Sequence, residues 1–89
     1  MALIDLLGRR WAMRVLWELR DTKLTFRALQ AACDKVSPTV LNDRIQELRE
    51  VALIDLDPDQ GYGLTALGLD LVEQFVPLVA WSERWARQL

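Results

Sequence analysis

Residues 37–50, SPTVLNDRIQELRE, predict a sharply bounded helix in the middle of an 89-residue chain. Ser37 suits the N-cap because its hydroxyl can accept from free backbone N–H groups. Pro38 suits the first helical position, where the N–H that proline lacks would have no helical partner. The apolar face holds Val40, Leu41, Ile45 and Leu48, and the polar face holds Thr39, Asn42, Asp43 and Gln46. The first face predicts core packing. The second is either a solvated surface or a surface that reads a ligand.

The segments on either side place this helix in a larger motif. Thr25 can cap a preceding helix, and residues 34–36 leave only a tight turn before the next one. After residue 52 the pattern alternates around a cluster of Pro, Asp and Gly at 57–61, which predicts a β-hairpin. We therefore expect a helix-turn-helix over about residues 25–50 and a wing over about 53–65.

Apolar residues also dominate both ends of the chain. Residues 2–7 predict a short helix, and residues 9–20 an amphipathic one. In the last helical region, about residues 66–88, apolar side chains cover more than half of the circumference, which a domain of this size cannot bury alone. Pro77 should kink or split this region. We therefore expect the C-terminal helices to serve dimerisation.

Length and charge bound the fold and the partner. Residues 1–89 form one domain, whose class we predict as mainly α (α+β). The net charge is −2, yet residues 1–52 carry nine Lys and Arg against seven Asp and Glu. Residues 53–89 carry two against six. The helix-turn-helix thus lies in the mildly basic part, which softens the argument from net charge against nucleic acid.

Several functional classes are excluded or disfavoured by the residue types present. The chain has no His and a single Cys, which excludes an internal disulfide, a His/Cys zinc site and a His-based triad. No nucleophile–base pair or phosphate loop appears, so we expect no enzyme activity and no cofactor. No signal peptide and no apolar run of about 18 residues is visible, so we expect a cytoplasmic protein without a membrane partner.

Five segments in register carry a family resemblance. They are LLGRRW at 6–11, LTFRALQ at 24–30, VSPTVLNDRIQELREVALID at 36–55, YGLTALG at 62–68 and W-x-x-x-W at 81–85. Nearly the whole chain thereby resembles the HxlR-type winged helix-turn-helix transcriptional regulators, a branch close to the MarR regulators. The chain lacks the N-terminal Cys that redox-sensing relatives use, so the resemblance does not extend to that mechanism.

The resemblance implies a homodimeric regulator, with helix 37–50 in the major groove of double-stranded DNA and the terminal helices in the dimer interface. By motif match, it assigns reading positions to Ser37, Thr39, Asn42, Arg44 and Gln46. The chemistry of the polar face agrees in part, since Asn and Gln amides can pair with adenine and Thr can contact a thymine methyl or a phosphate. Asp43 would face a cytosine amine or a phosphate, and Arg44, at the edge of the buried face, suits a phosphate.

The wing sequence DPDQG departs from the family pattern, because it carries two Asp and no Lys or Arg. Phosphate contacts supply much of the affinity for DNA. We therefore expect Arg27, Lys35 and Lys23 to supply them in place of the wing. The expected operator is pseudo-palindromic, with half-sites about one helical turn or a multiple of it apart.

The expected dimer interface draws on apolar residues of both ends. Its candidates are Leu3, Leu7, Trp17, Phe75, Leu78, Trp81 and Trp85. Aromatic side chains at an interface bury large areas. Because a cavity lined by such residues could hold an aromatic molecule, we also keep the hypothesis of a small aromatic effector.

Simpler interpretations remain beside these. We expect Trp11 and Cys33 in the core, and Asp57 and Asp59 in a turn rather than a metal site. The Arg9-Arg10 pair either contacts phosphate, caps the preceding short helix, or pairs with Asp5.

The function also has two alternatives. The first is a sequence-specific DNA-binding regulator that acts as a repressor. The second is a winged-helix protein-interaction module that has lost DNA binding, which the acidic wing and the net charge favour. A continuous basic strip from Arg27 and Lys35 to Arg44 would favour the first.

Overall fold

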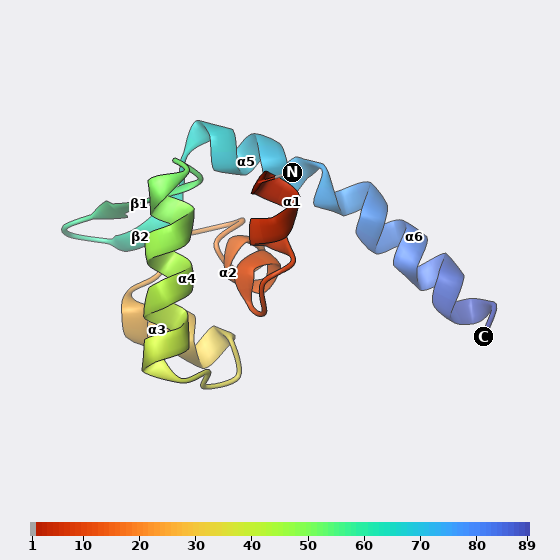
Figure 1. Ribbon diagram of the computed structural model, residues 1–89, viewed down its shortest axis with the longest axis horizontal. Helices are drawn as coiled ribbons and strands as arrows, with labels where there is room; N and C mark the ends of the chain where they lie inside the picture. Colours follow the sequence, from red (N-terminus) through yellow and green to blue (C-terminus); the bar gives the residue numbers. More distant parts are fainter. Residues whose placement is uncertain (1) are drawn as a thin grey trace.

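A two-stranded hairpin projects from one side of a group of helices in this winged helix-turn-helix, a computed structural model that describes residues 2–89 (Figure 1). The elements are α1 (Ala2–Leu7), α2 (Ala12–Glu18), α3 (Phe26–Ala32), α4 (Pro38–Glu50), β1 (Ile54–Asp57), β2 (Gly61–Leu64), α5 (Ala66–Glu73) and α6 (Phe75–Arg87). The predicted mainly α class and the order of elements are confirmed.

The two helices of the helix-turn-helix begin at the predicted caps. The Oγ1 atom of Thr25 accepts a hydrogen bond from the backbone N–H of Ala28 at 3.2 Å. The Oγ atom of Ser37 accepts one from the N–H of Val40 at 3.3 Å. Each cap satisfies a backbone donor that has no partner inside its helix. The first residue of α3 and of α4 therefore follows from local sequence.

The turn between α3 and α4 is tight because two consecutive residues are left-handed. Asp34 and Lys35 have φ of 56° and 58°. The side-chain amide of Gln30 donates to the carbonyl of Val36 at 2.8 Å and closes the turn. This conformation reverses the chain between α3 and α4 within residues 33–37.

Arg14 ties α2 to the end of α3. Its guanidinium donates to the carbonyl of Ala32 at 2.8 Å and to Oε1 of Glu18 at 2.9 Å. The carbonyl of Ala32 lies in the last turn of α3, where helix carbonyls need partners from outside the helix. The helix-turn-helix is thereby joined to the α2 scaffold by a side chain as well as by the core.

The core lies between the helix-turn-helix, α2, the wing and α5. Its buried members are Val15, Leu16, Leu19, Leu29, Cys33, Val36, Leu41, Ile45, Leu48, Leu53, Ile54, Val72 and Phe75. The apolar face of α4 is buried through Leu41, Ile45 and Leu48, each 0% exposed. Cys33 is fully buried and Trp11 packs against the cluster, as predicted.

The second helix is shorter than the predicted span of residues 9–20. It begins at Ala12, because Trp11 has a φ of 76° and residues 8–11 form a turn instead. The left-handed conformation costs a residue with a side chain about 1–2 kcal/mol. Hydrophobic spacing cannot reveal where such a conformation occurs. Trp17, a candidate for the dimer interface, is half-buried and packs against the core of its own protomer.

The hairpin is antiparallel, with Ile54 opposite Leu64 and Asp57 opposite Gly61. Leu24 pairs with the outer side of this hairpin. Its backbone N–H donates to the carbonyl of Tyr62 at 2.9 Å, and its carbonyl accepts from the N–H of Tyr62 at 2.7 Å. Gly61 has a φ of 100°, and a Cβ there would lie 2.4 Å from the carbonyl oxygen of Leu24. The wing is thus held against the segment that precedes α3.

The C-terminal helical region divides at Gln74, three residues before Pro77. A proline ring clashes with the carbonyl four residues earlier, here that of Glu73, and removes a helix donor. The predicted split is confirmed, and it falls one turn before the proline. Helix α6 then extends away from the rest of the molecule (Figure 1). Within residues 2–89, no helix is both long enough and apolar enough to cross a membrane.

Candidate nucleic-acid interface

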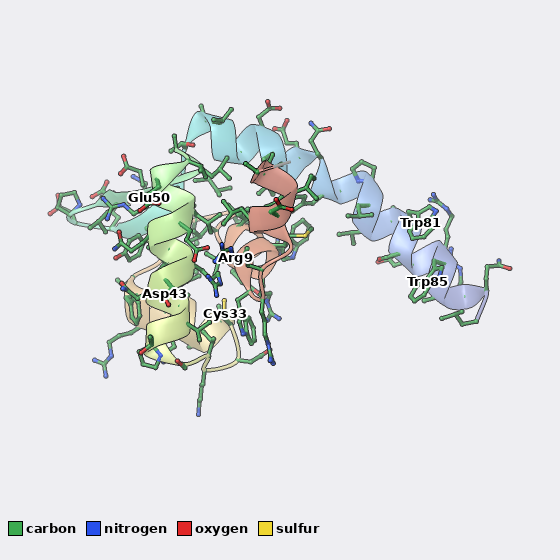
Figure 2. The ribbon with its side chains drawn as sticks, viewed as in Figure 1. Arg9, Cys33, Asp43, Glu50, Trp81 and Trp85 are labelled. Atoms are coloured by element: carbon green, nitrogen blue, oxygen red, sulfur yellow. The ribbon has the colours of Figure 1, made fainter. Side chains whose placement is uncertain are left out.

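The polar face of α4 is exposed and free of internal contacts. Thr39, Asn42, Asp43 and Gln46 are all exposed. Within residues 2–89, none of these four side chains makes a hydrogen bond or an ion pair, whereas the opposite face of α4 is buried. Figure 2 shows Asp43 midway along α4 and Glu50 near its end. Two amides, a hydroxyl and a carboxylate are therefore available to a ligand on one helix face.

The beginning of α4 adds a polar edge to this face. Ser37 is exposed but its oxygen already accepts from Val40, so it closes the helix end. The N-terminus of a helix carries a partial positive charge and free N–H donors, which favour a phosphate. Thr39 lies one residue further and is exposed. The predicted positions 37 and 39 are thus brought together at one helix end.

Two predicted cations lie near the helix-turn-helix without internal partners. Arg27 follows the first residue of α3, and Lys35 lies in the left-handed turn before α4. Both are exposed, and within residues 2–89 neither side chain has an ion-pair partner. Their charges therefore remain available to phosphate.

Arg44 differs from Arg27 and Lys35, because its guanidinium forms hydrogen bonds inside the protein. Its side chain is only 16% exposed. The Nε atom donates to the carbonyl of Arg10 at 2.9 Å, and a terminal nitrogen pairs with Oε1 of Glu47 at 2.5 Å. The predicted strip of cations from Arg27 and Lys35 is therefore interrupted at Arg44.

The Arg9-Arg10 pair joins the same cluster. A guanidinium nitrogen of Arg9 lies 3.5 Å from Oε1 of Glu47, and Figure 2 shows Arg9 between the α1–α2 turn and α4. The guanidinium of Arg10 lies over the ring of Trp11, 5.8 Å from its centroid. The acidic partner that the structure shows for Arg9 is therefore Glu47, a residue that was not among the predicted contacts of this pair.

The acidic wing is partly neutralised by Lys23. Its Nζ atom lies 2.9 Å from Oδ2 of Asp57, while Oδ1 of Asp57 accepts from the backbone N–H groups of Asp59 and Gln60. The hydrogen bond from Lys23 is the main cause that lowers the pKa of Asp57, and the two backbone donors add to it. Asp57 is thus the last residue of β1, its carboxylate accepts from the backbone of the turn that follows, and Lys23 is engaged with the wing.

Arg49 is a further candidate for a phosphate contact, outside the residues predicted from the sequence. It lies three residues after Gln46, hence on the same side of α4. With Gln46 and Glu50 it lines a shallow hollow between the end of α4 and β1. Its guanidinium has no ion-pair partner within residues 2–89. The three-residue spacing from Gln46 was the signal that could have found it.

The predicted dimer residues divide into two groups. Leu3, Leu78, Trp81 and Trp85 are 44–52% exposed, on α1 and α6. Trp81 and Trp85 stack on each other, with ring centroids 6.5 Å apart, on the part of α6 that lies far from the domain body (Figure 2). The other three, Leu7, Trp17 and Phe75, pack against the core of their own protomer, and Phe75 is 7% exposed.

An apolar groove opens between α1, the end of α4 and α5. Its walls are Leu3, Val51, Leu53, Leu67 and Leu71, with Asp70 and Gln74 at its polar edge. The volume of about 440 Å³ is within the range of small-molecule sites. The apolar walls of the groove are aliphatic, in contrast to the aromatic lining predicted for an effector cavity.

Comparisons with known proteins agree with this arrangement. The HxlR-like helix-turn-helix family profile matches residues 6–89. The HTH-type transcriptional regulator YvaP of Bacillus subtilis is 26% identical over 88 residues, covering 92% of this chain and 82% of YvaP. An HTH-type transcriptional regulator of Methanocaldococcus jannaschii is 26% identical over 89 residues, covering 96% and 83% of the two chains. Both relatives are named as regulators and not as enzymes.

A solved structure gives the same result in three dimensions. The crystal structure of quinone-bound YodB from B. subtilis superposes with a TM-score of 0.86 at 25% identity, covering 93% of both chains. The family profile spans nearly the whole chain, and the winged helix-turn-helix presents its polar helix face outward. The chain therefore belongs to the HxlR-like helix-turn-helix family of DNA-binding transcriptional regulators.

Proposed function

We propose that this protein is a homodimeric repressor that binds a pseudo-palindromic operator through α4 of each protomer. The observation that carries the proposal is the exposed face of α4, whose amide and hydroxyl side chains have no partners within residues 2–89. A helix that is buried on one face and carries unpartnered readers on the other is suited to the major groove.

The chemistry of this face suggests how a half-site is read. Asn42 and Gln46 can each pair bidentately with an adenine, and Thr39 can contact a thymine methyl or a phosphate. Asp43 can accept from a cytosine amine. With Ser37 at the helix end, these residues fall in the first two-thirds of α4, the part of a recognition helix that usually reaches base edges.

Few cations support this reading surface. Arg27, Lys35 and Arg49 are without internal ion pairs in the described part of the chain. Each neutralised phosphate changes the slope of log K against log salt by about −0.9. Two to three contacts in each protomer of a dimer therefore predict a slope of roughly −4 to −5. Arg44, also a predicted contact, would have to leave Glu47 and the carbonyl of Arg10 to reach a phosphate.

The dimer part of the proposal is supported by unpartnered apolar residues on α1 and α6. Leu78, Trp81 and Trp85 are half-exposed on a helix that extends from the domain body. Exposed aromatic clusters of this kind are rare on monomers and typical of interface cores. A second copy of the chain that covers α6 would place two α4 helices in one assembly, as a two-fold operator requires.

A small aromatic effector is part of the proposal, and the solved structure of YodB with a quinone suggests the chemical class. The aliphatic groove beside α1 has a suitable size for one ring system. Isothermal titration with a panel of quinones and aromatic acids tests this part. If none of them produces heat or changes DNA affinity, the effector is not of this class.

A regulator of this kind acts on chromosomal DNA, so we place it in the cytoplasm.

The central experiment selects duplexes from a random pool and measures their binding by fluorescence anisotropy. Asn42→Ala and Gln46→Ala should each lose about 1–3 kcal/mol of discrimination at one base pair of each half-site. Gln88→Ala, which removes an amide from the far end of α6, should change neither affinity nor preference. Unchanged binding by both α4 variants would show that α4 does not read the bases.

The alternative function is a winged-helix protein-interaction module without DNA affinity. The specific observation that favours it is the engagement of two predicted phosphate contacts inside the protein, Lys23 with Asp57 and Arg44 with Glu47. Binding to a mixed-sequence duplex at low salt separates the two functions. A regulator retains weak non-specific affinity under these conditions, whereas the module shows none.

A further inference from the structure

A cluster of charged groups joins α4 to the turn between α1 and α2. Arg44 donates through Nε to the carbonyl of Arg10 at 2.9 Å and through a terminal nitrogen to Glu47 at 2.5 Å. Arg9 approaches the same oxygen of Glu47 at 3.5 Å. One guanidinium therefore connects a backbone atom of the turn to a carboxylate one helical turn along α4.

The other oxygen of Glu47 makes this cluster costly to break. The Oε2 atom of Glu47 is buried and has no hydrogen-bond partner within residues 2–89. A buried carboxylate oxygen is expensive to leave unpaired, and losing its cation as well makes the cost larger. Arg44 is therefore held in place by its own hydrogen bonds, and also because its departure would remove a cation from the carboxylate of Glu47.

The turn that accepts from Arg44 has a strained conformation. Trp11, directly after the accepting carbonyl, is left-handed with a φ of 76°, and Arg10 lies over its ring. Strained backbone of this kind persists where surrounding contacts hold it. The hydrogen bond from Arg44 is one such contact, so the position of the turn and the position of α4 depend on each other.

We propose that Arg44 and Glu47 are positioning residues, which set the orientation of α4 against the α1–α2 turn and thereby align the reading face with the bases. This inference rests on the proposed role of α4 in DNA recognition. It assigns the guanidinium of Arg44 to an internal contact, whereas the family motif match assigns it to DNA.

The two roles predict opposite results for Glu47→Gln. If Arg44 contacts phosphate, the loss of its internal carboxylate frees the guanidinium, and binding to every duplex tightens. If Arg44 positions α4, the same change loosens the helix and weakens binding to the selected duplex only. Glu50→Gln is the matched control, because it removes the same charge from the same helix at an exposed residue that has no partner in the described chain.

The experiment compares a duplex selected by the wild-type protein with a scrambled duplex of equal length, over a series of salt concentrations. For Glu47→Gln we expect about a tenfold or larger loss of affinity for the selected duplex relative to Glu50→Gln. For Arg44→Lys we expect a loss of about the same size relative to the wild-type protein. Affinity for the scrambled duplex and the salt slope should stay unchanged. Lysine keeps the charge but offers one ammonium in place of the planar fork that reaches both acceptors.

Arg44→Gln supplies a second, independent readout. A phosphate contact predicts that this variant weakens both duplexes equally and lowers the magnitude of the salt slope by about 0.9 per protomer. Positioning predicts that only the selected duplex is affected and that the double variant Arg44→Gln/Glu47→Gln loses no more affinity than the worse single variant.

Folding is controlled separately, by urea titration and circular dichroism, and binding is measured only where each variant is fully folded. A purely structural role would change the urea midpoint and leave the ratio of selected to scrambled affinity as in wild type. That result, or tighter binding of both duplexes by Glu47→Gln than by Glu50→Gln, would overturn the inference. If Asn42→Ala and Gln46→Ala reduce base preference while Arg44→Lys does not, the positioning role fails and the proposed function stands. Failure of the wild-type protein to select any duplex overturns both.

Discussion

The ammonium of Lys23 lies 2.9 Å from Oδ2 of Asp57, and this ion pair ties the tip of the wing to the segment between α2 and α3. The same segment continues into Leu24, which pairs with Tyr62 of β2. The acidic wing is therefore both neutralised and anchored by residues just upstream of the helix-turn-helix, and the cation that anchors it is withdrawn from DNA.

Asp57→Asn should release Lys23 while the amide oxygen still accepts from the backbone of the turn. We expect tighter non-specific binding to a mixed-sequence duplex and a salt slope steeper by about one per protomer. Anisotropy titrations over a range of KCl concentrations measure both quantities. Asp59→Asn is the control, because it removes the same charge without contact to Lys23. An equal change in both variants would show that only overall charge matters.

The same carboxylate predicts a pH dependence of stability. The pKa of Asp57 is lowered, mainly by the hydrogen bond from Lys23 and further by two backbone donors. Its ionised form therefore favours the folded state. This contribution is present above the unfolded pKa of about 3.9 and is lost as the pH falls through the lower folded pKa. The urea midpoint of the wild-type protein should fall as the pH is lowered from 7, and the part of this fall that is due to Asp57 should be absent in Asp57→Asn.

Phe75 and Trp85 lie on the same helix but should respond differently to truncation. Phe75 is 7% exposed and belongs to the core, so Phe75→Ala should cost about 3–5 kcal/mol of unfolding free energy. Trp85 is 52% exposed, so Trp85→Ala should leave the protomer folded and weaken the dimer by about 2 kcal/mol, or roughly thirtyfold. Sedimentation equilibrium and urea titration separate the two effects. A dimer unchanged by Trp85→Ala would place the interface elsewhere.

Gly68 should tolerate no side chain, although it lies inside α5. Alanine usually stabilises a helix by about 0.5–1 kcal/mol relative to glycine. A Cβ at this position would lie 2.0 Å from the carbonyl oxygen of Leu53. That oxygen also accepts from the backbone N–H of Thr65. Gly68→Ala should therefore destabilise the protein by about 1–3 kcal/mol, while Leu69→Ala on the exposed side should have little effect. A higher urea midpoint for Gly68→Ala would contradict this packing.

Cys33 should be unreactive in the folded protein. It is fully buried, and burial raises the pKa of its thiol. Labelling by a thiol reagent at pH 8 should be slower than in urea by about two orders of magnitude or more. Because the folded protein disfavours the thiolate, stability is full below the unfolded pKa of about 8.5 and falls as the pH rises towards the folded value. Cys33→Ala should lack this alkaline loss, and rapid labelling of the native protein would show that the thiol is accessible.

Local signals predicted those parts of the fold that depend on neighbouring residues. Thr25 and Ser37 each accept a backbone hydrogen bond at the start of a helix, because capping needs only the next three residues. The breaker cluster at 57–61 placed the hairpin for the same reason. The exposed face of α4 also followed from spacing, since a helix that buries Leu41 and Ile45 must turn Asn42 and Gln46 outward.

Spacing could not predict the conformations imposed by distant contacts. Trp11 fits a helical apolar pattern, yet its left-handed backbone starts α2 three residues late. Phe75 belongs to the same run of apolar residues as Trp81 and Trp85, but α6 leaves the domain body directly after it, so Phe75 alone of α6 is buried. In both cases the backbone path, which no local pattern encodes, determines what each side chain contacts.

Order of elements, helix caps and the outward polar face of α4 are thus properties of the chain itself, because each depends on residues a few positions apart. Which partner each charged side chain pairs with is a property of the folded molecule. Lys23 and Asp57 are 34 positions apart, as are Arg10 and Arg44, and both pairs meet only after the hairpin and α4 have packed. Two of the cations that sequence assigns to phosphate are therefore engaged within the protein, since a folded surface pairs charges by distance in space and a sequence orders them by position.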